Sequence, residues 1–143
     1  MSATITIQLS PSAIALADRF KAAPQQFPQA IKRGMNRALL IVSGRIQERR
    51  LTGRGPFPVS EHRLGERTRQ LKLRTRSTPA QITSEGNQSV VTGAIGSSVF
   101  YASIHEFGGK HAPERAPFRT GIRENITYIT EEIEREVLKS LKP

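Results

Sequence analysis

The most regular pattern in the chain is a pair of stretches in which apolar residues recur every three or four positions. The first stretch begins near Pro24 or Pro28 and ends at about Arg49 or Arg50. Its apolar positions are Ile31, Met35, Ala38, Leu39, Val42 and Ile46. Those of the second stretch are Ile122, Ile126, Ile129, Ile133, Val137 and Leu141. This spacing places apolar side chains on one side of an α-helix, so the sequence predicts two long amphipathic helices.

Other segments alternate between polar and apolar residues, which is the pattern of a half-buried strand. We predict strands over residues 4–9, 71–77, 80–84 and 89–95. A turn at Gly86-Asn87 is expected to join the last two. Ser10-Pro11 has the residues of a helix start, so a short helix is expected before Pro24.

The order of these elements predicts an α+β fold, in which a small antiparallel sheet of about four strands packs against two long helices. Short helices are expected over residues 61–70 and 99–107. The 143 residues suit a single domain spanning residues 1–143. Residues 51–60 contain two Gly and two Pro, so a long flexible loop is predicted around residues 50–60.

The positive charge of the chain, +10 in total, is unevenly distributed. Residues 45–76 contain ten Lys or Arg and three Glu, whereas residues 122–143 contain four Lys or Arg and five Glu. A concentrated basic segment indicates a polyanion or an acidic protein as its partner, although a solvated loop of a basic protein has the same composition. The residues expected to face a neighbour or a DNA channel are Arg67, Arg69, Lys72, Arg74 and Arg76. The last three would share one side of a strand over 71–77.

Residue types that carry common catalytic chemistry show no familiar spacing. The chain has no Cys, which excludes disulfides and thiolate metal sites. Its three histidines, His62, His105 and His111, lack the spacing of metal ligands. Neither a Gly-x-Ser-x-Gly elbow nor a P-loop is present. We therefore predict a non-enzymatic protein without cofactor or metal.

Membrane and secretion signals are also missing from the sequence. The longest apolar run, near Ala38–Val42, is far shorter than the roughly 20 residues of a spanning helix. The N-terminus has no basic region followed by an apolar stretch, the pattern of a secretory signal. We expect a soluble chain that matures in a cytoplasm and has no membrane partner.

Residues 99–119 contain a distinctive combination of motifs. Tyr101-Ala102 is followed by His105-Glu106-Phe107-Gly108-Gly109, then by Arg115-Ala116-Pro117-Phe118 and the C-terminal amphipathic helix. This arrangement resembles the tail-completion, minor-tail and virion-morphogenesis proteins of the head–tail connector region of tailed bacteriophages. Those proteins typically have a Tyr-Ala-x-x-x-Glu/Gln-x-Gly segment, a loop with a Pro-Ala-Arg-Pro-Phe-like motif, and a terminal helix.

The resemblance implies a structural virion protein that forms a homo-oligomeric ring, commonly sixfold, at the head–tail junction or in the upper tail. Its partners would be copies of itself, neighbouring neck and tail proteins, and DNA in the channel. It would be found in the virion and, during assembly, in the host cytoplasm. The residues expected at interfaces are Phe57, Val59, Tyr101, His105, Glu106, Phe107, Phe118 and Arg119. We expect three of these, Phe57, Val59 and Phe118, to be apolar anchors of an interface, because apolar side chains on loops have no evident place in the core.

Two other interpretations remain open. One is a nucleic-acid-binding protein that uses residues 45–76, whose affinity would fall steeply with salt. The other is a small hydrolase or nuclease centred on His105 and Glu106. Alanine at either position would then abolish activity without disrupting the fold.

Overall fold

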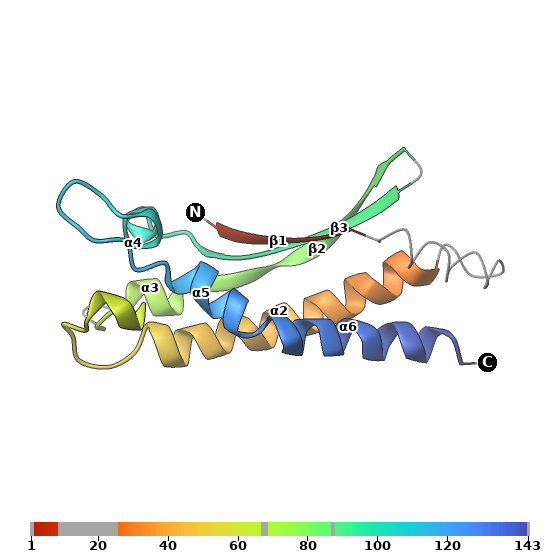
Figure 1. Ribbon diagram of the computed structural model, residues 1–143, viewed down its shortest axis with the longest axis horizontal. Helices are drawn as coiled ribbons and strands as arrows, with labels where there is room; N and C mark the ends of the chain where they lie inside the picture. The colour runs from red at the N-terminus through yellow and green to blue at the C-terminus, as the bar shows by residue number, and fades with distance from the viewer. Residues whose placement is uncertain (1, 9–25, 67–68, 87, 143) are drawn as a thin grey trace.

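The first apolar stripe forms the helix α2, Gln26–Arg50, which is the longest element described (Figure 1). The computed structural model describes residues 2–8, 26–66, 69–86 and 88–142. The prediction of this helix and of its C-terminal end is confirmed. Its side chains Met35, Leu39 and Val42 are buried in the hydrophobic core. The short helix expected after Ser10-Pro11 lies outside the described residues.

Three strands form an antiparallel sheet that lies along one side of α2 (Figure 1). The strands are β1, Ser2–Gln8, β2, Thr75–Glu85, and β3, Gln88–Ser97, in the spatial order β1-β3-β2. Strand β3 comes very close to α2 at Gly93, where a Cβ atom would lie 2.3 Å from Leu39 Cδ1. These bounds confirm the predicted strand near the N-terminus and the predicted hairpin, and both β2 and β3 are longer than predicted.

The prediction of about four strands is wrong, because the described residues form three. Residues Gln70–Leu73 make a single helical turn, α3, and β2 begins only at Thr75. The amide of Arg74 donates to Gln70 O at 3.0 Å and closes this turn, and Thr75 Oγ1 donates to Leu71 O at 2.7 Å. These bonds belong to a helical turn, so of the strand predicted over residues 71–77 only Thr75–Ser77 forms, as the start of β2.

The prediction of two long helices is also wrong, because α2 is the one long helix within the described residues. The C-terminal stripe is divided into α5, Pro117–Glu124, and α6, Ile126–Ser140. The division falls at the buried Asn125, whose Nδ2 donates to Gly121 O at 2.8 Å and whose Oδ1 accepts from Arg45 Nη1 at 2.6 Å. An asparagine side chain that is hydrogen-bonded to nearby backbone competes with a continuous helix. The helix is therefore interrupted here, although the apolar spacing continues across the break.

Close backbone contact joins α6 to α2. A Cβ atom on Gly34 would lie 2.6 Å from Ile133 Cα, so glycine is what allows the two helices to approach. At the solvent edge, Glu136 lies 3.7 Å from Arg33 and 3.6 Å from Arg37. None of the helices in the described ranges is both long and apolar enough to cross a membrane.

The remaining elements gather at one end of the molecule (Figure 1). The short helix expected over 99–107 is confirmed as α4, Ala102–Phe107. The helix expected over 61–70 is wrong, because residues 62–66 are not helical and the nearby helical turns are η1, Val59–Glu61, and α3. At this end α4, α3 and the loop 51–66 lie together beside the N-terminal end of α5.

Candidate assembly site around α4

The carboxylate of Glu106, at the end of α4, is fully buried and binds the start of α5. Its two oxygens accept the backbone N–H groups of Phe118, at 3.0 Å, and of Arg119, at 2.9 Å. These donors belong to the first turn of α5, where no earlier backbone carbonyl is available to them. The N-cap residue, Ala116, has no side-chain hydrogen bond to offer. Glu106 therefore caps α5 from another helix, with its negative charge at the positive end of the helix dipole.

Arg119 returns from α5 to the same carboxylate. Its Nε donates to Glu106 Oε1 at 3.0 Å, and its Nη2 donates to Glu106 O at 2.7 Å and Glu114 Oε1 at 2.5 Å. The hydrogen bond to Glu106 is the main reason that the pKa of Arg119 is raised above its ordinary value, despite the opposing effect of burial. The guanidinium also lies 5.0 Å from the centre of the Phe107 ring. Arg119 thus closes the loop between α4 and α5.

Arg115 connects the same loop to residues 51–66. Its backbone amide donates to His105 O at 3.0 Å, and its Nη1 donates to Phe57 O at 2.7 Å and Arg63 O at 3.0 Å. The carbonyl of Arg115 accepts from His62 Nδ1 at 2.7 Å. One arginine therefore satisfies carbonyls of the Gly- and Pro-rich loop and holds it against α4.

The loop itself is folded tightly on its own backbone. The amide of Leu64 donates to Arg50 O, and the amide of Glu66 donates to Gly53 O, both at 2.8 Å. A Cβ atom on Gly65 would lie 2.5 Å from Gly55 N, so the two backbone segments meet without room for a side chain. The Gly residues of this loop thus serve a close backbone crossing.

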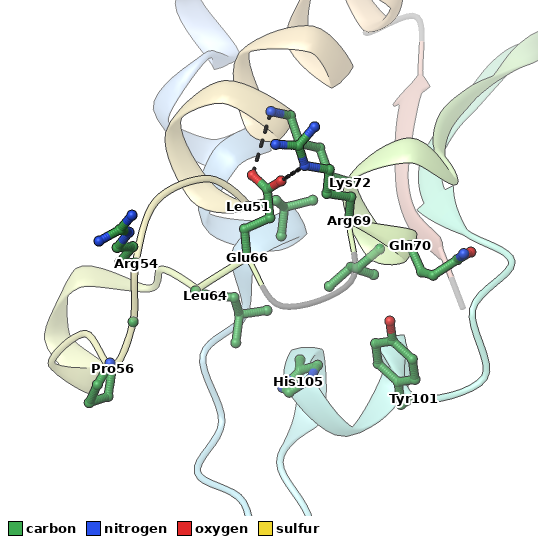
Figure 2. A pocket seen from close by; sticks show the side chains of 13 residues that line it. Leu51, Arg54, Pro56, Leu64, Glu66, Arg69, Gln70, Lys72, Tyr101 and His105 are labelled. Atoms are coloured by element: carbon green, nitrogen blue, oxygen red, sulfur yellow. Dashed lines mark ion pairs between the residues drawn. The ribbon is translucent and has the colours of Figure 1, made fainter.

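A cavity of about 880 Å³ lies between this loop, α3 and α4. Figure 2 shows Glu66 near its centre, paired with Arg69 and with Lys72, the latter at 3.9 Å. Tyr101 and His105 line the α4 side, with their rings edge to face and 5.8 Å apart. Apolar side chains line the cavity as well, while Arg69 and Lys72 lie at Glu66 and Arg54 lies apart on the loop (Figure 2).

His105 and Glu106 do not act on a common point. The ring of His105 lines the cavity, whereas the carboxylate of Glu106 is bound to α5. Burial, and secondly the positive charge of Arg115, lower the pKa of His105 below its usual 6.5. No group of three or more His, Asp or Glu residues within the described ranges could hold a metal ion. His105 and Glu106 therefore make two separate contacts, one at the cavity and one with α5.

The predicted basic face does not form on one strand. Arg69 and Lys72 pair with Glu66, and Arg74 Nε donates to Gln70 Oε1 at 3.1 Å. Arg76 lies on β2 and is exposed, and Arg67 lies outside the described residues. The side-by-side row of Lys72, Arg74 and Arg76 is therefore wrong, because α3 turns the chain before β2 begins.

Three further predicted interface residues, Phe118, Phe57 and Val59, differ from one another in their burial. Phe118 is fully buried and belongs to the core, so its assignment as an exposed loop anchor is wrong. Phe118 is the second residue of α5, and the helix directs its side chain into the core. Phe57 is partly covered by the guanidinium of Arg63, 4.1 Å from the ring centre. Val59 is exposed, as the prediction requires.

The sequence prediction included Phe107 but missed two other residues of an exposed apolar surface at α4, Phe100 and Ile104. Phe100, Ile104 and Phe107 have exposed fractions of 87%, 41% and 57%. These three side chains, which we call the α4 patch, are spaced i, i+4, i+7 in the sequence; Ile104 and Phe107 lie on α4, and Phe100 lies in the turn just before it. On the other side, Ala102 and Glu106 are buried. The spacing was visible in the sequence, but it does not show which side of a short helix faces the core.

Comparison with family models, with curated proteins and with solved structures found no match to this chain.

Proposed function

We propose that the chain is a structural, non-enzymatic virion protein of a tailed bacteriophage, which forms a ring at the head–tail junction or in the upper tail. The observation that carries this proposal is the α4 patch. Three large apolar side chains on α4 and in the turn before it are exposed, and single soluble subunits seldom leave such a cluster uncovered. A surface of this kind is typical of a subunit that completes its burial by association.

The contacts made by the motif residues of 99–119 support the same proposal. Glu106, Arg115 and Arg119 all bind backbone groups or one another within the subunit. Their role here is to hold α4 and α5 in a fixed position, with the α4 patch facing outward. The resemblance of residues 99–119 to connector proteins thus has a physical meaning as an assembly scaffold.

Mass spectrometry of purified tailed particles from a host that carries the sequence tests the virion role. We expect peptides of this chain in the particles, and antibody labelling at the neck or upper tail. Electron microscopy of the purified chain is expected to show rings. Particles that are complete and infectious without this chain would contradict the proposal.

The nucleic-acid alternative relies on cations that are largely engaged within the subunit. Arg50 pairs with Glu124, Arg63 donates to Thr52 O at 3.1 and 2.8 Å, and the α3 cations pair with Glu66. Binding to duplex DNA at two salt concentrations separates the two functions. An affinity that falls with salt along a slope set by several phosphate contacts would favour the alternative.

A further inference from the structure

Two exposed surfaces lie well apart along the molecule. Helix α4 is at one end of the long axis, and α6 extends from the middle toward the other end (Figure 1). On α6, Glu131, Glu134 and Leu138 are exposed, and Leu138 has an exposed fraction of 61%. Their spacing of three and four places them on one side of the helix, opposite the buried Ile129 and Ile133. We call these three residues the α6 surface.

The two surfaces have similar lengths. The α4 patch extends from Phe100 to Phe107, and the α6 surface from Glu131 to Leu138, which is the same number of residues. On helical geometry the α6 surface covers about 10 Å. If Leu138 lay among the three side chains of the α4 patch, apolar area of both surfaces would be buried.

Their charges are of opposite sign. Residues 49–66, 69–74 and 99–119, which form the α4 end, contain ten Lys or Arg and four Glu, a net charge of +6. Helix α6 by itself contains four Glu, one Arg and one Lys, a net charge of −2, and two cations of α2, Arg33 and Arg37, lie beside its Glu136. Within the described residues, Glu131 and Glu134 make no ion pair, and neither does Lys110 beside α4. Charge complementarity therefore points to contact between the α4 end and α6.

We propose that the α4 patch of one copy docks on the α6 surface of the next copy of this chain. Leu138 inserts among the apolar side chains of the α4 patch, and Glu131 and Glu134 face Lys110. The inference rests on the proposed function, because its partner is a second copy. Since the two surfaces differ and lie well apart, the contact is heterologous and propagates into a ring or filament. A symmetric contact between two α4 patches would instead bring two positive ends together.

Two variants and their mixture test this contact by analytical ultracentrifugation. The first carries Phe100→Ser and Ile104→Ser, and the second carries Glu131→Lys and Glu134→Lys. We expect each to weaken self-association about thirtyfold or more relative to the unmodified chain. In a 1:1 mixture, the intact α6 surface of the first meets the intact α4 patch of the second. The mixture is therefore expected to form a dimer of the 15.9 kDa chain and nothing larger.

Matched controls use residues away from both surfaces. Leu40→Ser removes an apolar side chain that is 67% exposed on α2, and Glu85→Lys reverses an exposed charge on β2. Neither change should alter association. Circular dichroism and thermal unfolding check that all variants fold.

Other outcomes overturn the inference in different ways. A mixture that stays monomeric, or association that depends on α4 but not on α6, excludes the heterologous contact. An oligomeric chain that neither variant affects excludes this interface and leaves the proposed ring intact. A chain that remains monomeric at millimolar concentration excludes the contact, and the particle analysis then decides the virion role independently.

Discussion

The two sides of α4 show how differently one short helix can use its residues. On the inner side, Ala102 and Glu106 are fully buried, and the Glu106 carboxylate is bound to the first turn of α5. On the outer side, Phe100, Ile104 and Phe107 are exposed. Within the described residues, the ring of Phe107 contacts the guanidinium of Arg119, and the ring of Phe100 contacts that of Tyr101. The inner side is complete within one subunit, whereas the outer side is not. Substitutions inside should therefore change stability, and substitutions outside should change association.

Glu106→Ala is expected to produce the largest loss of stability. It removes the acceptor of two backbone N–H groups and leaves Arg119 without its main partner. Buried hydrogen bonds to a charged group are strong, and their loss leaves donors unsatisfied, so we expect the free energy of unfolding to fall by about 3 kcal/mol. Urea denaturation monitored by circular dichroism measures this.

Glu114→Ala is the matched control, because Glu114 binds Arg119 at the solvent edge. Its loss should lower the free energy of unfolding by less than about 1 kcal/mol. Equal effects of the two alanine variants would mean that Glu106 is not the cap that joins α4 to α5.

A pair of glycine substitutions on α2 extends the comparison to α6. Gly34→Ala forces a Cβ atom to within 2.6 Å of the Ile133 backbone, which cannot move aside as a side chain could. We expect the free energy of unfolding to fall by about 2 kcal/mol. Gly44→Ala places a Cβ atom in open space on the same helix, so it should stabilise the chain by up to about 1 kcal/mol. Thermal and urea unfolding of the two variants should therefore change in opposite directions.

Periodicity in the sequence predicted the elements that are long and locally consistent. The α2 stripe and the hairpin of β2 and β3 follow from it. It failed where single side chains decide the backbone. Asn125 interrupts the C-terminal stripe through its bond to Gly121 O, and the bonds of Arg74 and Thr75 form α3 in place of a strand. Such bonds depend on side-chain contacts that an apolar pattern does not contain.

The candidate site was predictable only in part for a similar reason. The motif residues 99–119 were identified, but their roles depend on contacts between positions distant in sequence. Arg115, for example, binds carbonyls of residues 57 and 63. Burial also separated residues that the sequence presents alike. Phe107 and Phe118 are both apolar residues of the motif, yet only Phe118 lies in the core.

The pH dependence of stability should reveal the inner position of His105, with a smaller effect than the substitutions above. Because its pKa is lowered in the folded state, the unfolded chain binds this proton first as the pH falls below 6.5. Stability is thus unaffected by His105 above that pH and decreases below it. His105→Gln should lose less stability than the unmodified chain between pH 7.5 and 5.5. Parallel losses in both would show that His105 is not held in this environment.

The smallest effect on stability is expected for Phe100→Ser, although it removes an aromatic ring. Phe100 is 87% exposed in the subunit, so folding transfers little of its surface from water, and its edge-to-face contact with Tyr101 at 5.4 Å is solvent-accessible. We expect the free energy of unfolding, measured on dilute protein, to change by no more than about 0.5 kcal/mol. At concentrations where the chain associates, the same variant should unfold at a lower temperature than the unmodified chain, because association stabilises the folded state. A large loss already in dilute protein would mean that the outer side of α4 supports the subunit itself, and the contrast between its two sides would fail.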